Sequence, residues 1–231
     1  MERRLSVAIN LLSLVILVWI GWQIHGYPSV DRVTVRASKA AIPSEPIALA
    51  NGGVAVGSDD APVVMVEYLD FVCPFCRRFA AEVQLVLQRE YIDNGVVQLV
   101  IRQFPLDIHA TARGAAEAVL CAQRQGAFLP FHDRLFQDEA GFDAVGLQTI
   151  AADLGLDGPG FERCLTDRHV AADVERDLTS ARDLGVSGTP TFFIGIRQAG
   201  GMLKVLERIG GARPLQDFRI AIERIRESLT E

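Results

Sequence analysis

Residues 67–78 of this chain read EYLDFVCPFCRR and carry two cysteines separated by Pro74 and Phe75. Residues 63–69 are apolar and rich in β-branched side chains apart from Glu67, which is typical of a buried strand. After the cysteines, apolar residues recur at helical spacing at Phe79, Val83, Val86, Leu87 and Tyr91. The pattern predicts that the two cysteines lie where a strand passes into a helix.

The proline between the cysteines indicates where that helix begins. Proline is best tolerated in the first turn, because its φ angle fits there and its missing N–H would have no partner. Pro74 therefore places Cys73 at or next to the N-cap. Backbone N–H groups and the helix dipole favour a thiolate there and lower its pKa below the free value of about 8.5. We expect Cys73 to be the attacking sulfur and Cys76 to be its disulfide partner.

Two cysteines at this spacing can also form half of a zinc site, and the chain has four cysteines and four histidines. A structural zinc site needs a second close pair of ligands. Cys121 and Cys164 stand far apart in the sequence, and no His-x-x-x-His pattern accompanies them. We therefore predict a redox-active pair and no metal.

A second motif lies at residues 185–194, GVSGTPTFFI. Pro190 stands at the start of a β-prone segment, where a backbone donor is expendable and the preceding peptide bond can be cis. Cys-Pro-Phe-Cys after a buried strand, together with Gly-Thr-Pro-Thr-Phe-Phe before the next strand, resembles the thioredoxin-fold disulfide oxidoreductases of the DsbA kind. The resemblance covers residues 54–229.

The resemblance implies roles for three further residues. In that family the loop proline is cis and packs against the active disulfide, and the residue before it offers its backbone to an extended substrate peptide. Pro190 and Thr189 occupy these positions. The family also has a buried acid six residues before the first cysteine, here Glu67, which would titrate high and exchange a proton with Cys76. The alternative is that Glu67 points to the exposed face of its strand.

One position departs from the family pattern. Strongly oxidising relatives have a histidine between the proline and the second cysteine, whereas this chain has Phe75, whose ring cannot donate a hydrogen bond to the Cys73 sulfur. We expect Pro74 and Phe75 to tune the site, toward a milder potential than in those relatives. Arg77 and Arg78 either add compensating positive charge or are solvated helix residues.

The other two cysteines stand in predicted helices whose sequences resemble those of relatives with a second, structural disulfide. The resemblance implies a bridge between Cys121 and Cys164, and an exported protein is the setting in which such a bridge persists. Two separate buried thiols are the alternative.

The amino terminus carries a different signal. Residues 5–22 are almost entirely apolar, which is about the length that a bilayer-spanning helix requires, and Arg3 and Arg4 precede them. We predict an uncleaved anchor over residues 1–25, a single transmembrane helix in the cell inner membrane with the catalytic domain on the periplasmic side. A cleaved signal peptide is the alternative.

The rest of the chain divides into two parts. Residues 26–51 contain three prolines and no sustained period, so we interpret them as a linker. A segment this short cannot bury a core of its own, which disfavours the dimerisation domain of DsbC-type isomerases. Residues 52–231 are then one α/β domain with the thioredoxin fold and a helical insertion at about 109–184.

Hydrophobic periodicity predicts the elements of this domain. Further strands are expected at 96–101, 191–196 and 203–209, and further helices at 109–125, 128–138, 145–154, 158–167, 170–184 and 215–229. The helical crossover predicts that the first two strands are parallel. The Gly200-Gly201 turn predicts an antiparallel hairpin between the last two.

The expected activity is disulfide donation without any cofactor beyond the redox-active disulfide. Expected partners are unfolded or reduced exported proteins and, from the resemblance alone, a quinone-linked membrane enzyme that reoxidises the pair. The net charge of −6 disfavours nucleic acid as a partner. A periplasmic thiol reductase or isomerase of the same fold is one alternative, and a copper-handling module that uses the cysteine pair is another.

Overall fold

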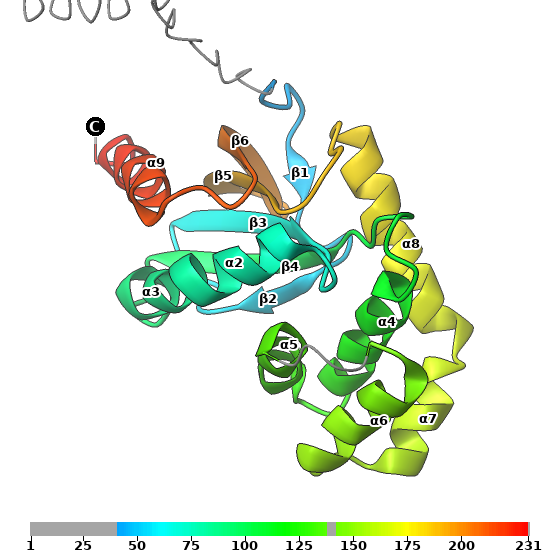
Figure 1. The fold of residues 1–231 in the computed structure, drawn as a ribbon. Helices are drawn as coiled ribbons and strands as arrows, with labels where there is room; N and C mark the ends of the chain where they lie inside the picture. The colour runs from blue at the N-terminus through cyan, green and yellow to red at the C-terminus, as the bar shows by residue number, and fades with distance from the viewer. Residues whose placement is uncertain (1–40, 138–141, 231) are drawn as a thin grey trace, which may run out of the picture. The chain divides into compact units, whose positions relative to one another are not determined.

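The computed structural model describes residues 41–137 and 142–230, which form a sheet flanked by helices (Figure 1). The sheet has six strands in the order β1-β6-β5-β3-β4-β2. The strands are β1 (Ile47–Ala48), β2 (Val54–Val56), β3 (Val63–Leu69), β4 (Val97–Gln103), β5 (Thr191–Gln198) and β6 (Met202–Gly210).

Strand β3 lies inside the sheet, and all seven of its residues are buried. It pairs in parallel with β4 and antiparallel with β5, so the predicted crossover through a helix is confirmed. Strands β5 and β6 form the predicted antiparallel hairpin. Gly200 and Gly201 adopt φ angles of 76° and 69° at its turn, a region that glycine enters without steric cost.

The helix after β3 begins as α2 (Pro74–Phe79) and continues through a π-helical turn (Ala80–Gln84), α3 (Leu85–Leu87) and a second π-helical turn (Gln88–Ile92). Phe79 fixes it to the sheet, since its ring centroid lies 4.5 Å from that of Phe192 and 5.3 Å from that of Phe218. Phe218 belongs to the last helix, α9 (Leu215–Glu227). Helices α2 and α9 therefore cover the same face of the sheet.

The helical insertion between β4 and β5 is confirmed. Its described helices are α4 (Ala112–Gln123), α5 (Phe128–Gln137), α6 (Ala144–Asp153), α7 (Gly158–Leu165) and α8 (Arg168–Asp183). Figure 1 shows α4 to α7 clustered beside the sheet, with α8 running from this cluster back to the sheet. Asp138, the predicted end of the second of these helices, lies outside the described residues.

A buried polar cluster joins α8 to the sheet face opposite α2. The fully buried Arg102 guanidinium donates to the Tyr68 hydroxyl at 3.0 Å and to the Ser180 hydroxyl at 2.7 Å. It also donates to the Ala48 carbonyl at 2.6 Å. On α8, the Asp177 carboxylate accepts the Gln103 N–H at 2.9 Å, and burial raises its pKa to about 7. Parts of β1, β3, β4 and α8 are thus held by one network.

Two strands differ from the sequence prediction. Strand β1 lies within the range 26–51 that we interpret as a linker, yet Ile47 is only 4% exposed and pairs with Leu203. Strand β2 is also absent from the prediction. Strands of two and three residues are too short to show the alternation that identifies a strand. The folded unit therefore begins before residue 52.

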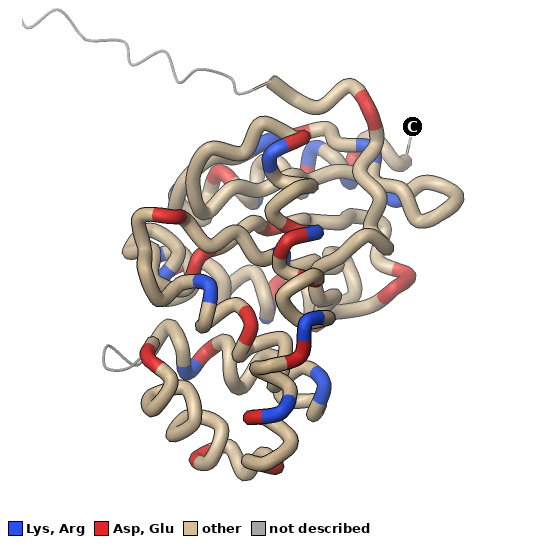
Figure 2. The backbone as a smooth tube through the Cα atoms, turned by 90° about the vertical axis from the view of Figure 1, so that its right-hand side faces the viewer, with Lys and Arg blue, Asp and Glu red and all other residues tan. Residues whose placement is uncertain are grey.

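The predicted transmembrane helix at residues 1–25 and the linker up to residue 40 lie outside the described residues. Across 41–137 and 142–230, no helix has both the length and the apolar character needed to cross a bilayer. Figure 2 shows basic and acidic residues interspersed along this part of the chain. Most of their ion pairs join exposed side chains, which contribute little to stability.

Candidate active site

Cys73 is the N-cap of α2, as the sequence predicts. Its backbone is extended, with φ −69° and ψ 122°, and Pro74 follows in the first helical turn. No side chain caps this helix end, and the Arg77 N–H donates to the Cys73 carbonyl at 3.1 Å. The Cys73 sulfur therefore stands at the end of the helix where backbone N–H groups lack carbonyl partners.

The surroundings of Cys73 lower the pKa of its thiol to about 5. The largest cause is a hydrogen bond from the Cys76 thiol, and the backbone N–H groups of Cys76 and Phe75 act in the same direction, as does the Thr189 side chain. Partial burial opposes them but is outweighed. In the thiol form, Cys73 donates to the Thr189 carbonyl at 3.4 Å. At neutral pH the Cys73 sulfur is thus a thiolate.

Cys76 has the opposite character. It is fully buried, and burial together with the neighbouring Cys73 sulfur raises its pKa well above the ordinary value. The Asp70 N–H donates to its sulfur at 3.5 Å. One sulfur of the pair is therefore ready to leave or attack as an anion, while the other holds its proton.

Glu67 lies beneath this pair. Its side chain is buried, so the alternative that it points to the exposed face of the strand is wrong. Burial raises its pKa to about 8, and its Oε2 has no hydrogen-bond partner among the described residues. A charge on Glu67 would raise the pKa of Cys76 further. The carboxyl group is thus protonated at neutral pH and lies close enough to Cys76 to influence its ionisation.

Thr189 and Pro190 complete the site from the other side. The peptide bond between them is cis, as predicted, and both residues are buried. The Thr189 carbonyl accepts from the Cys73 thiol, and the buried Thr189 hydroxyl, which has no other partner among the described residues, favours the Cys73 thiolate. The structure therefore brings Glu67 and the two cysteines together with the proline loop, although Thr189 follows Cys73 by 116 residues in the chain.

An Asp70–His109 pair, which the sequence pattern did not predict, holds the loop before Cys73. The Asp70 carboxylate accepts the Val72 N–H at 2.7 Å and the Leu106 N–H at 2.9 Å. His109 Nδ1 lies 2.7 Å from the same carboxylate. Asp70 follows β3 and His109 follows β4, and polar residues at the carboxyl ends of neighbouring parallel strands are the signal that could have indicated the pair.

Phe75 acts through its backbone rather than its ring. Its N–H contributes to the low pKa of Cys73, while its side chain is 53% exposed. The Arg78 guanidinium lies over this ring, 5.3 Å from the centroid, and donates to the Ala212 carbonyl at 3.2 Å. The low pKa of Cys73 therefore arises mainly from hydrogen bonds around the sulfur.

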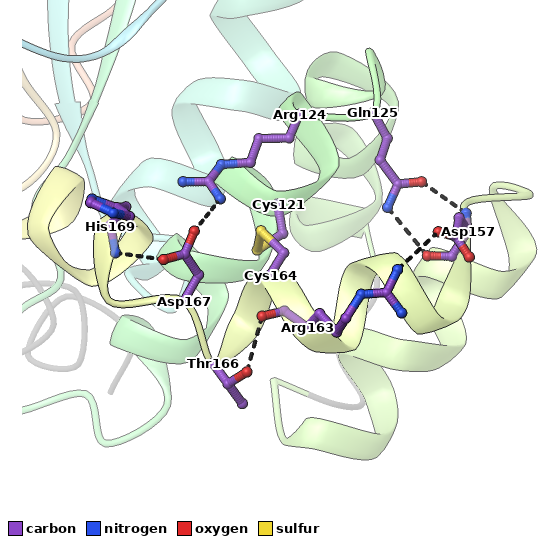
Figure 3. Close-up of a disulfide and its surroundings, with 9 residues drawn as sticks. All are labelled: Cys121, Arg124, Gln125, Asp157, Arg163, Cys164, Thr166, Asp167 and His169. Atoms are coloured by element: carbon purple, nitrogen blue, oxygen red, sulfur yellow. Dashed lines mark hydrogen bonds and ion pairs between the residues drawn. A yellow bond between two sulfur atoms is a disulfide. The ribbon is translucent and has the colours of Figure 1, made fainter.

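Cys121 and Cys164 form the expected disulfide, with their Cα atoms 5.7 Å apart (Figure 3). The bridge joins α4 to α7. An ion pair between Arg124 and Asp167, at 2.6 Å, lies beside it. Within the described residues, no group of three or more histidine, cysteine or acidic side chains is placed to hold a metal ion.

A family model described as Thioredoxin matches residues 50–207. The chain belongs to the thioredoxin family. Within it, the chain groups with the DsbA-like thiol:disulfide oxidoreductases. Probable disulfide bond formation protein D of Bacillus anthracis is 33% identical over 147 residues, which are 60% of this chain and 68% of that protein.

Two other known proteins are similar to this thioredoxin-family protein. The crystal structure of alpha-DsbA1 from Wolbachia pipientis superposes with a TM-score of 0.67 at 27% identity, covering 75% of this chain and 90% of that one. The Na(+)/H(+) antiporter NhaA 3 of Salinispora tropica is 39% identical over 146 residues, 63% of this chain. The chain spans only 22% of the length of that antiporter.

Proposed function

We propose that this thioredoxin-family protein donates disulfides to exported proteins through the Cys73–Cys76 pair. The observation that carries the proposal is the low pKa of Cys73, about 5. A sulfur that is stable as an anion is a good leaving group, and stabilising the reduced form makes the corresponding disulfide more oxidising.

The proposed cycle begins with the Cys73–Cys76 disulfide. A substrate thiolate attacks the Cys73 sulfur, which forms a mixed disulfide and releases the Cys76 sulfur. Glu67, protonated because its pKa is about 8, supplies the proton that Cys76 takes up. A second substrate thiolate attacks the substrate sulfur of the mixed disulfide and releases the Cys73 thiolate. The substrate loses two electrons as its disulfide forms, and the cysteine pair gains them.

The proposal includes an extracytoplasmic location and a membrane tether at residues 1–25. The apolar residues 5–22 after Arg3 and Arg4 support both. The name of the Bacillus anthracis relative, a probable disulfide bond formation protein, supports the location, because disulfides form in oxidising compartments. Substrates would be unfolded or reduced exported proteins, held as an extended strand beside Thr189. The enzyme that restores the disulfide would be a quinone-linked membrane protein, which we propose from the family resemblance.

A reductase of the same fold is the second candidate. The observation that favours it is Phe75, whose exposed ring offers the Cys73 sulfur no hydrogen bond. A milder thiolate stabilisation would give a potential nearer to that of thioredoxin, about −270 mV.

Equilibration of the Cys73–Cys76 pair with glutathione, combined with trapping of its redox state in cells, distinguishes the two directions. Disulfide donation predicts a potential well above that of thioredoxin and a mostly oxidised pair. A potential near −270 mV with a mostly reduced pair would establish the reductase instead. The Cys73→Ser variant should lose exchange with reduced, unfolded proteins, and retained exchange would contradict both directions.

A further inference from the structure

A groove of about 500 Å³ opens beside the active site. Its lining comes from three segments: Phe75 and Arg78 of α2, residues 187–191 around the cis proline, and the end of β6 with the loop that follows. Because Thr189 lines the groove and its carbonyl contacts the Cys73 sulfur, a peptide lying there would place its cysteine within reach of Cys73.

The charged side chains in the groove are all arginines. Arg78, Arg208 and Arg213 line it, and no acidic residue does. This sign is opposite to the net charge of the chain, which is −6. A local positive field in an acidic protein favours ligands that the rest of its surface repels.

Two of the three arginines have no carboxylate partner among the described residues. Arg78 donates to the Ala212 carbonyl and lies over the Phe75 ring. Arg208 donates to the Leu184 and Gly185 carbonyls at 3.3 and 2.8 Å, and its guanidinium lies 5.1 Å from the centroid of the Phe193 ring, on the sheet face opposite α2. These contacts fix the positions of both guanidinium groups and leave their charges uncompensated by an acid.

Arg213 differs because it forms an ion pair with Asp217 at 2.8 Å. Its charge is therefore already partly matched. The positive charge on the α2 side of the groove that no carboxylate matches is therefore that of Arg78, whose guanidinium lies over the exposed Phe75 ring. A guanidinium binds a carboxylate through paired N–H donors, and the ring offers an apolar contact to the same peptide.

We propose that this groove selects substrate segments that carry an aspartate or glutamate close to the reacting cysteine. The inference rests on the proposed function, because it concerns the peptides with which the cysteine pair exchanges. Arg78 binds the carboxylate, and the residues around Thr189 hold the peptide backbone.

The test uses three dithiol peptides that differ only in a glutamate, glutamine or lysine two residues from the first cysteine. For each peptide, we measure the rate at which the disulfide form of the full chain oxidises it. This rate is divided by the rate at which hydroxyethyl disulfide oxidises the same peptide, which removes differences in thiol acidity between the peptides. We expect the normalised kcat/KM to favour the glutamate peptide over the lysine peptide by about tenfold at low salt. The preference should shrink in 0.5 M salt, where charges are screened within about 4 Å.

Arg78→Gln should reduce this glutamate-to-lysine ratio several-fold. Arg168→Gln is the matched control, since Arg168 is an exposed arginine at the start of α8 that does not line the groove, and its ratio should equal that of the unmodified chain. The salt dependence of the unmodified chain tests the proposal even if Arg78→Gln does not fold. Equal normalised rates for all three peptides would overturn the groove proposal alone. If no peptide is oxidised, the proposed function fails, and the groove proposal with it.

Discussion

Cys73 and Cys76 have opposite acidities because they meet different surroundings within one turn of helix. Cys73 receives hydrogen bonds at the helix N-terminus, which lower its pKa to about 5. Cys76 is fully buried, and burial raises its pKa. The two acidities are coupled, because the Cys76 thiol is the main hydrogen-bond donor to the Cys73 thiolate.

Removing that donor should raise the pKa of Cys73. In Cys76→Ala the midpoint of the Cys73 alkylation rate against pH should move from about 5 toward the ordinary thiol value of about 8.5. Cys76→Ser is the matched control, because its hydroxyl can still donate, so its midpoint should fall between the two. An alanine variant that titrates like the unmodified chain would show that Cys76 does not stabilise the thiolate.

Glu67 makes the stability of the protein depend on pH. Its pKa is raised from 4.5 to about 8, so between these values the unfolded chain ionises while the folded chain keeps the proton. The contribution of Glu67 to the free energy of unfolding should therefore decline as pH rises from 4.5 to 8 and level off above 8. The decline attributable to Glu67 is up to about 5 kcal/mol, at about 1.4 kcal/mol per pKa unit.

Glu67→Gln should remove this decline, which urea denaturation at pH 5 and pH 8 measures. For each protein, the free energy of unfolding at pH 8 is subtracted from that at pH 5. This difference cancels the cost of burying the glutamine amide, which does not depend on pH. Glu162→Gln, at an exposed position on α7, should keep the decline of the unmodified chain. A Glu67→Gln protein with the same decline would contradict a raised pKa for Glu67.

Among the elements, those with long periodic patterns were predictable. The crossover helix, the insertion helices and the hairpin follow from spacing and turn residues, and the structure confirms them. The π-helical turns after α2 left no signal, because the same apolar positions fit both helix types. The Asp70–His109 pair depends on two strand ends meeting in space, which local spacing does not encode.

The disulfide between α4 and α7 should stabilise the insertion. It closes a loop with a sequence separation of 43, for which chain entropy gives about 4 kcal/mol. Replacing both Cys121 and Cys164 by serine should lower the free energy of unfolding by up to this amount. The measurement is made with Cys73 and Cys76 also replaced by serine, so that only the structural bridge differs. Equal melting temperatures with and without the bridge would refute the stabilisation.

For the molecule as a whole, the short strand β1 supplies part of a polar network in the interior. The Ala48 carbonyl is an acceptor for Arg102, whose side chain is fully buried. Ile47 adds a buried apolar contact from the same strand. The segment interpreted from the sequence as a linker therefore contributes to stability at its carboxyl-terminal end.

A chain that begins at residue 52 should consequently be less stable than one that begins at residue 41. Loss of a hydrogen bond to a charged group costs about 1.5–3 kcal/mol, and the exposed apolar surface adds to this. Chemical denaturation of the two chains measures the difference. Equal stability of the chains from 41 and 52 would show that β1 is dispensable.

The most direct test of the central claim is the titration of the Cys73 thiolate by its absorbance at 240 nm in the reduced protein, with Cys73→Ser as the blank and the Cys121–Cys164 bridge intact. A thiolate held by the hydrogen bonds around α2 predicts a midpoint at about pH 5 that is absent from the blank. A midpoint near the free thiol value of about 8.5 would contradict it.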